Sequence, residues 1–131
     1  MKTANYYTFE QPAKEDIITL LENIGGYWLP DYDEGSLIVS DAQINIHFDP
    51  NVVKSENYSK DELQNAKKLI GKEPRTALII EIFNQQSEAL TYGFCDLLHE
   101  KWGGALEKYQ VDLMLPVEIT GKTELKPKVI A

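Results

Sequence analysis

The chain has 131 residues, of which 43% are apolar and 26% are charged, and its formal net charge at pH 7 is −8. This composition is typical of one globular domain with its own core, and it excludes a disordered or fibrous chain. Cys95 is the only cysteine, so an internal disulfide is excluded as well. The first twenty residues have no apolar run of the signal-peptide type, and no segment is long enough to span a membrane. We therefore expect a cytoplasmic protein that binds no membrane.

The charge is unevenly distributed along the chain. Residues 1–50 hold nine acids and two lysines, a formal charge of −7, whereas residues 51–75 hold six bases and four acids. This asymmetry indicates a protein that meets a charged macromolecule. The negative net charge disfavours nucleic acid as the partner. The lysines of the basic segment also fit the solvent-exposed side of an amphipathic helix, so they are weak evidence for binding nucleic acid.

The chain begins with a predicted strand and a predicted helix. The aromatic-rich run at residues 5–10 is typical of a strand. A helix is expected over residues 12–24, where Ile17, Leu20 and Leu21 recur at helical spacing and a double glycine follows.

A loop and a hairpin are predicted next. Residues 27–36 contain a proline, a glycine and several acids, which favours a loop. Residues 36–40 and 43–48 are expected to pair as a hairpin, in which His47 alternates with core residues and should face away from Ile46.

The second half of the chain predicts two helices and two strands. The first helix covers residues 59–70 and begins with a capping box between Ser59 and Glu62. The most apolar run, residues 76–83, should be a buried central strand, and a helix is expected over residues 85–102. Alternating apolar residues predict a last strand over residues 109–115.

These elements predict an α+β fold. We expect a mostly antiparallel sheet of about five strands with the helices packed on one face, which makes a two-layer sandwich. A ferredoxin-like split βαβ core is one topology for the first six elements. Residues 1–115 are assigned to a single α+β domain, and residues 116–131 to a C-terminal tail or edge segment.

No catalytic or metal-binding motif stands out. Cys95 and His99 lie one helical turn apart, but two ligands do not make a zinc site and the pair adjoins an apolar stripe, so both are expected to be structural. The acidic loop does not have the spacing of a calcium-binding loop. We therefore expect no catalytic residue, no metal site and no cofactor, and a protein that is not an enzyme. A small enzyme whose pocket residues converge only in three dimensions is an open alternative.

The loop after the first helix is the best candidate for a binding surface. Its large aromatic groups alternate with carboxylates, a combination that suits a protein partner rich in lysine and arginine. The candidate partner-binding residues are Tyr27, Trp28, Asp31, Tyr32, Asp33 and Glu34. A solvated turn is the competing interpretation of the loop, and an ordinary core position is the competing interpretation of Trp28.

A resemblance to a known class of proteins adds a candidate function. Residues 75–106 (RTALIIEIFNQQSEALTYGFCDLLHEKWGGAL), a predicted strand and a helix that ends in Trp-Gly-Gly, are similar to segments of small acidic immunity proteins of bacterial polymorphic toxin and contact-dependent inhibition systems. The resemblance implies a cytoplasmic protein that binds a toxin domain, often a basic nuclease, and fills its phosphate-binding cleft with carboxylates. It carries over no functional residue.

A homo-oligomeric structural or regulatory protein is the other open class. In that interpretation Ile38, Val39 or the aromatic first strand forms an interface at a sheet edge. We therefore expect a monomer or a homodimer.

Overall fold

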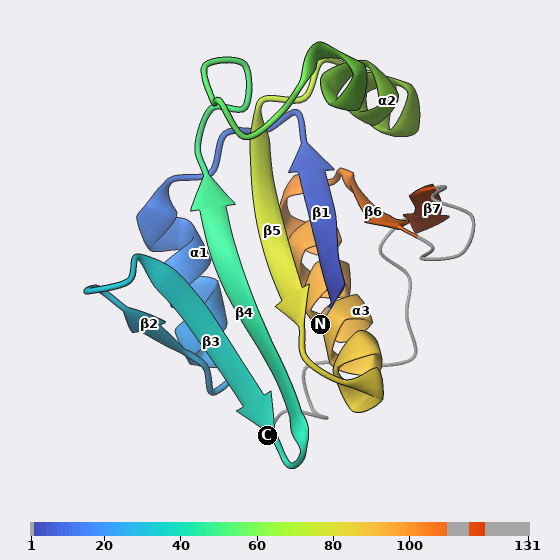
Figure 1. Ribbon diagram of the computed structural model, residues 1–131. Coiled ribbons are helices and arrows are strands. Elements are labelled where there is room, and N and C mark those ends of the chain that lie inside the picture. Colours follow the sequence, from blue (N-terminus) through green and yellow to red (C-terminus); the bar gives the residue numbers. More distant parts are fainter. Residues whose placement is uncertain (1, 110–115, 120–131) are drawn as a thin grey trace.

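The computed structural model describes residues 2–109 and 116–119. Seven strands and three helices follow one another along the chain: β1 (Lys2–Thr8), α1 (Lys14–Asn23), β2 (Tyr27–Leu29), β3 (Glu34–Val39), β4 (Ala42–Asp49), α2 (Lys60–Ile70), β5 (Thr76–Ile82), α3 (Gln85–Trp102), β6 (Ala105–Tyr109) and β7 (Pro116–Ile119) (Figure 1). None of the described helices combines the length and the apolar composition that a membrane span needs.

The strands form one antiparallel sheet in the order β2-β3-β4-β5-β1-β6-β7. An α+β fold with an antiparallel sheet is thus confirmed, with two strands more than the five expected. β5 is the middle strand, as its apolar composition predicted. The ferredoxin-like order is not observed, because it would insert β1 between β4 and β5, whereas here β5 pairs directly with β4 and β1 lies beyond it.

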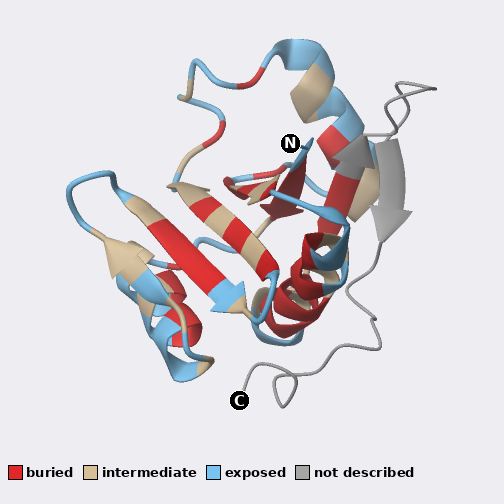
Figure 2. Ribbon diagram, turned by 60° about the horizontal axis from the view of Figure 1, so that its bottom comes forward, coloured by how far each residue is buried: buried red, intermediate tan, exposed pale blue. Residues whose placement is uncertain are grey.

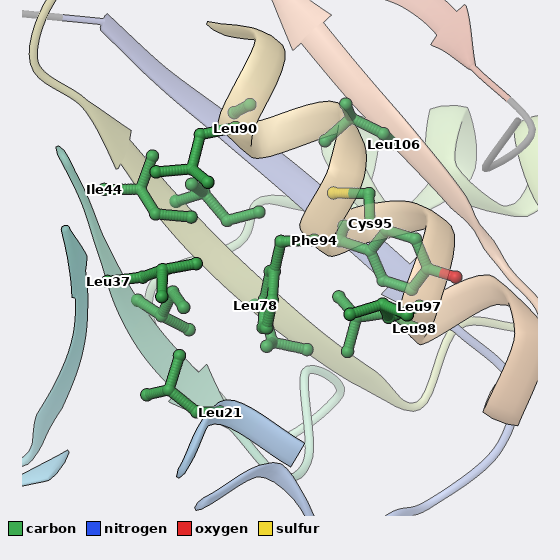
Figure 3. Packing of buried hydrophobic residues seen from close by; sticks show 14 of the residues in the cluster. Leu21, Leu37, Ile44, Leu78, Leu90, Phe94, Cys95, Leu97, Leu98 and Leu106 are labelled. Atoms are coloured by element: carbon green, nitrogen blue, oxygen red, sulfur yellow. The ribbon is translucent and has the colours of Figure 1, made fainter. Parts of the chain in front are cut away.

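The main core lies between one face of the sheet and helices α1 and α3. Buried and partly exposed residues alternate along β4 (Figure 2), and side chains of the strands meet those of α1 and α3 in this layer (Figure 3). Residues with no exposed surface include Leu21 of α1, Leu37, Ile44 and Ile80 of the sheet, and Phe94 and Leu98 of α3.

Helix α2 lies on the opposite face of the sheet, near the end where β1 ends and β5 begins (Figure 1). Its Ala66 packs in a second, smaller cluster with Tyr7 and Ala77, and the Tyr7 and Tyr58 rings meet edge to face at 5.8 Å. The expectation that all helices pack on one face is therefore wrong. The amphipathic pattern of α2 shows which side of the helix is buried, but it carries no information on which face of the sheet receives that side.

The polar part of this second face is formed by β3, β4 and β5. Its members are Glu34, Asn45, His47 and Glu81, all partly exposed, and we refer to these four residues as the polar face. His47 points away from the main core, as its alternation with Ile46 predicted.

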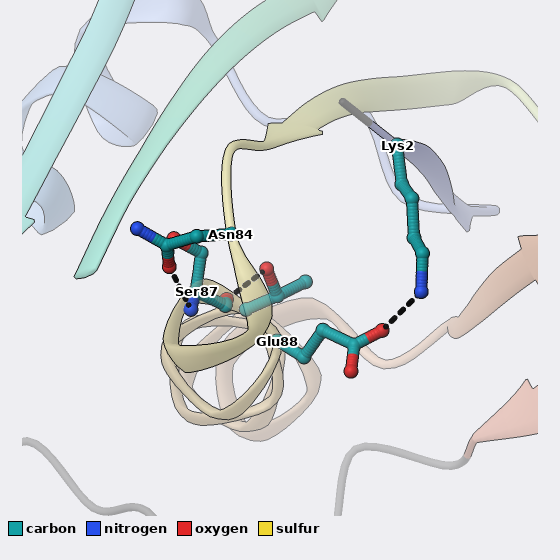
Figure 4. Close-up of polar contacts among 5 residues, drawn as sticks. Lys2, Asn84, Ser87 and Glu88 are labelled. Atoms are coloured by element: carbon teal, nitrogen blue, oxygen red, sulfur yellow. Dashed lines mark hydrogen bonds and ion pairs between the residues drawn. The ribbon is translucent and has the colours of Figure 1, made fainter.

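Polar caps define the beginnings of α2 and α3. The predicted capping box is present, since the Ser59 hydroxyl accepts a hydrogen bond from the Glu62 amide at 3.1 Å and the Glu62 carboxylate accepts one from the Ser59 amide at 3.0 Å. At α3 the Asn84 side chain accepts a hydrogen bond from the Ser87 amide at 2.9 Å (Figure 4). Glu88 in the same turn forms an ion pair with Lys2 of β1 at 3.2 Å (Figure 4).

Three expectations about the strands need correction. Residues 27–36 are not a loop, because most of them belong to β2 and β3. The strand β6 begins directly after the double glycine of α3 and was not predicted, while the strand expected at residues 109–115 falls, apart from Tyr109, outside the described residues. The aromatic first strand cannot form a sheet edge, because β1 pairs with β5 on one side and β6 on the other. β7 pairs with β6, so residues 116–119 form a strand of the sheet.

Candidate functional site

The hairpin of β2 and β3 carries the predicted binding residues, and its tip is closed by local contacts. The Tyr32 amide donates a hydrogen bond to the Leu29 carbonyl oxygen at 3.2 Å, and Asp33 adopts a left-handed backbone with φ of 51°. Aspartate tolerates this conformation better than most residues do. The tip residues 30–33 are all exposed.

Packing against α1 holds the hairpin in place. Trp28 lies opposite Gly35 in the strand register, and a Cβ atom at Gly35 would come within 2.5 Å of Leu21 Cδ2 and 3.0 Å of Trp28 Cε3. A glycine at this position therefore lets the Leu21 side chain and the indole ring lie directly on the backbone of β3. The result is a hairpin with a packed base and an exposed tip.

The structure separates the predicted binding residues into three groups. Trp28 faces the main core and packs against it, in agreement with its competing interpretation as a core residue. Tyr32 is 74% exposed at the tip between Asp31 and Asp33, and Tyr27 is 44% exposed. Glu34 follows the tip directly, but its carboxylate belongs to the polar face, where it pairs with His47. Tyr32 is thus the most exposed aromatic residue of the predicted set. The Trp28 indole instead packs between the hairpin and the main core.

Lys14 connects α1 to the hairpin tip. Its ammonium group forms an ion pair with the Asp33 carboxylate and lies 5.6 Å from the centre of the Trp28 ring. An exposed ion pair of this kind contributes roughly 0–1 kcal/mol to stability. Its position shows, however, that the first turn of α1, with the exposed acids Glu15 and Asp16, lies beside the tip. Glu15 adds an exposed carboxylate next to this contact, whereas Asp16 lies on the side of α1 that faces Lys101 and Trp102 of α3.

The polar face contains a cluster that the sequence analysis did not identify. His47 Nε2 lies 2.8 Å from Glu81 Oε1 and 3.3 Å from Glu34 Oε2. One possible ligand atom from each of these side chains falls within 4.8 Å of the others. The three residues belong to β3, β4 and β5, and the strand register brings them together. Two sequence signals were present: His47 faces away from the core, and Glu81 interrupts the apolar run of β5.

A shallow hollow of about 370 Å³ adjoins this cluster. His47 lines it together with Asp49, Asn51 and Lys54 from the connection that leads to α2. The hollow is open to solvent and has both charged and apolar walls. It could hold a small polar group beside the cluster.

Cys95 and His99 have structural contacts. The thiol has no exposed surface within the main core (Figure 3), and this burial raises the pKa of Cys95 far above its ordinary value, so the reactive thiolate is disfavoured. His99 Nδ1 donates a hydrogen bond to the Gly104 carbonyl oxygen at 3.0 Å, which ties the end of α3 to the start of β6.

Comparison with known proteins adds no relative. No protein-family model matches the chain, and no curated protein or solved structure is significantly similar to it.

Proposed function

We propose that this protein is a non-catalytic binding protein that engages a basic protein partner through the tip of the β2–β3 hairpin and the first turn of α1. The observation that carries the proposal is Tyr32, which is 74% exposed between the exposed acids Asp31 and Asp33. An aromatic side chain in this position offers a large rigid surface that a partner can desolvate. Carboxylates around it would form the charged rim of the interface.

The base of the hairpin supports this role. Because Trp28 and Leu21 pack on Gly35, the tip is presented from a fixed strand pair. Little backbone ordering would then be needed on binding, which lowers the entropic cost of association.

The charge around the tip favours a basic partner. Glu15 on α1 adds to Asp31 and Asp33, while Lys14 is engaged in the ion pair with Asp33. Exposed charges of one sign act over about 8 Å at physiological ionic strength and speed the approach of an oppositely charged protein.

Within this proposal, the partner is a basic toxin domain of the nuclease type and the protein is its immunity protein. The acidic surface supports this assignment, and the loose resemblance of residues 75–106 to segments of such proteins suggested it. Inhibition would follow from occlusion, because carboxylates of the hairpin would take the positions of nucleic-acid phosphates in the toxin cleft.

The experiment is the kinetics of binding to the purified product of the neighbouring gene at low and at physiological ionic strength. In the test variant, Glu15→Gln, Asp31→Asn and Asp33→Asn are combined, and Glu34 is kept so that the polar face is unchanged. We expect association at low salt to slow by about tenfold or more and its salt dependence to flatten.

The matched control removes the same amount of charge from other exposed positions of the molecule. It combines Glu56→Gln, Asp61→Asn and Glu100→Gln, three exposed positions outside the hairpin and α1. If both variants slow association equally, net charge and not the hairpin governs encounter, and the proposed surface is wrong. If the neighbouring product does not bind the wild-type chain, the immunity assignment is wrong.

Self-association through β3 is a second candidate function. Ile38 is 49% exposed, and β2 covers β3 only as far as Ser36, so within the described part of the chain no strand pairs with the outer edge of β3 beyond that residue. An exposed apolar edge of this kind can pair with a second copy. Light scattering after size-exclusion chromatography tests the candidate: Ile38→Lys should convert a dimer to a monomer, and a wild-type monomer would eliminate it.

A further inference from the structure

The geometry points to a divalent-cation site on the polar face, with Glu34, His47 and Glu81 as its protein ligands. This inference does not depend on the proposed partner, since the three side chains lie on the strands of the sheet and not at the hairpin tip. The ion that suits the site best is Zn²⁺, which accepts imidazole nitrogen and carboxylate oxygen together.

The strand register brings the ligands together. Gly35 pairs with Ile46, so the next residue pair in the same antiparallel register places Glu34 opposite His47. On the other side of β4, Glu81 pairs with Asn45 and is therefore the diagonal neighbour of His47. Long side chains reach one another across both of these spacings.

The distances between the ligand atoms fit a small ion. Zinc binds nitrogen and oxygen at about 2.0–2.2 Å, so the ligand atoms of a tetrahedral site lie roughly 3.3 Å apart. His47 Nε2 is 3.3 Å from Glu34 Oε2 and 2.8 Å from Glu81 Oε1. All three ligand atoms lie within 4.8 Å of one another, so the Glu34 and Glu81 oxygens would have to approach each other by at most about 1.5 Å to reach this spacing.

The hydrogen-bonding pattern also favours an ion. Both carboxylates approach the same ring nitrogen, and that nitrogen carries at most one hydrogen to share between them. A cation between the three groups would satisfy both carboxylates and use the lone pair of the neutral imidazole. A purely hydrogen-bonded cluster is the competing arrangement, and the experiment separates the two.

The surroundings are suited to a metal that keeps open positions. The ligand side chains of Glu34, Glu81 and His47 are 18%, 24% and 40% exposed, so an ion could enter from solvent and retain water. His47 also lines the neighbouring hollow. An oxygen-bearing ligand held there would lie beside the ion.

The experiment is calorimetric titration of Zn²⁺ into the untagged, metal-free chain. We expect saturable binding of one equivalent. His47→Gln and Glu81→Gln should each weaken it by at least about tenfold, the lower end of what loss of a supporting group at a metal site costs. The chain offers a matched control in His99→Gln, which removes the only other histidine and should leave the affinity unchanged.

The folded state of each variant is checked by circular dichroism, and thermal unfolding gives a second readout. Zinc should raise the melting temperature of the wild-type chain and of His99→Gln, but not of folded His47→Gln. The inference would be overturned by absence of saturable binding, by binding that survives His47→Gln, or by binding that His99→Gln removes. Affinity for Mg²⁺ equal to that for Zn²⁺ would also overturn it, because the carboxylates alone would then hold the ion. None of these measurements requires a protein partner, so failure here is distinguishable from failure of the proposed function.

Discussion

Replacement of Gly104 by alanine tests a close backbone contact between the start of β6 and β1. Gly104 has a φ of +98°, which costs an L-residue about 1–2 kcal/mol. A Cβ atom there would also overlap the Tyr7 carbonyl oxygen and lie 3.1 Å from Thr8 Cα. Both neighbours belong to the backbone of β1, which is paired on its two sides and cannot shift alone. We expect Gly104→Ala to lower the free energy of unfolding by about 3 kcal/mol or more, which is in the range of overpacking in a core.

Gly71→Ala provides the matched control. Gly71 ends α2 with a φ of +77°, but no atom lies within 4 Å of a Cβ placed there. In this variant the free energy of unfolding should fall only by the cost of the left-handed backbone, about 1 kcal/mol. The difference of about 2 kcal/mol between the two variants therefore measures the close approach of Gly104 to β1.

Urea unfolding followed by circular dichroism gives both values, provided that the m-value is unchanged. For a domain whose total stability is about 5–15 kcal/mol, a difference of this size is well resolved. Equal losses in the two variants, within about 0.5 kcal/mol, would refute the reasoning, because only the backbone conformation would then matter.

Three further predictions concern a cap, the buried thiol and the hairpin. Ser59→Ala should lower the free energy of unfolding by about 1 kcal/mol, measured by urea unfolding, because it removes one half of the capping box. Cys95 should react with a thiol reagent only after denaturant unfolds the chain, and rapid reaction in the native state would contradict its burial. Trp28→Ala should cost about 2 kcal/mol because the indole packs on the core, whereas Tyr32→Ala should change stability by less than about 0.5 kcal/mol and speed dissociation from the partner. A large stability loss for Tyr32→Ala would show that the tip is structural.

Local sequence signals predicted the helices well. The expected range of residues 85–102 coincides with α3, and the capping box places the start of α2 correctly. The helix expected at residues 12–24 is shorter by two residues at its start and one at its end. In each case the periodicity and the flanking cap or glycine lie within a few residues of the element that they define.

Features that depend on distant residues could not be predicted in this way. β2 has only three residues and is followed by Pro30, so its composition alone is that of a loop. Its pairing with β3 brings Trp28 against Gly35, a contact between residues of two different segments. The position of β5 between β4 and β1 is defined by pairings between strands that lie far apart in the sequence, and the pattern within one segment does not report such pairings.

The candidate sites show the same limit. The exposed tip with Asp31, Tyr32 and Asp33 was visible as a run of neighbouring residues. The cluster of the polar face was not, since Glu34, His47 and Glu81 meet only across three strands.

The place of β1 in the sheet has a consequence for how the chain folds. β1 leads the described chain, yet its partners are β5 and β6, so Tyr6 must find Leu78 on one side and Leu106 on the other. During synthesis on a ribosome, β1 could not pair until β5 and β6 had been made, and both edges of this aromatic strand would be unpaired until then. Pairings between residues so far apart in sequence slow folding, because the chain loses the entropy of loop closure before the stabilising contacts form. We therefore expect the β3–β4 hairpin to form early and the docking of β1 to be a late event, during which this segment is the part of the chain most prone to aggregation.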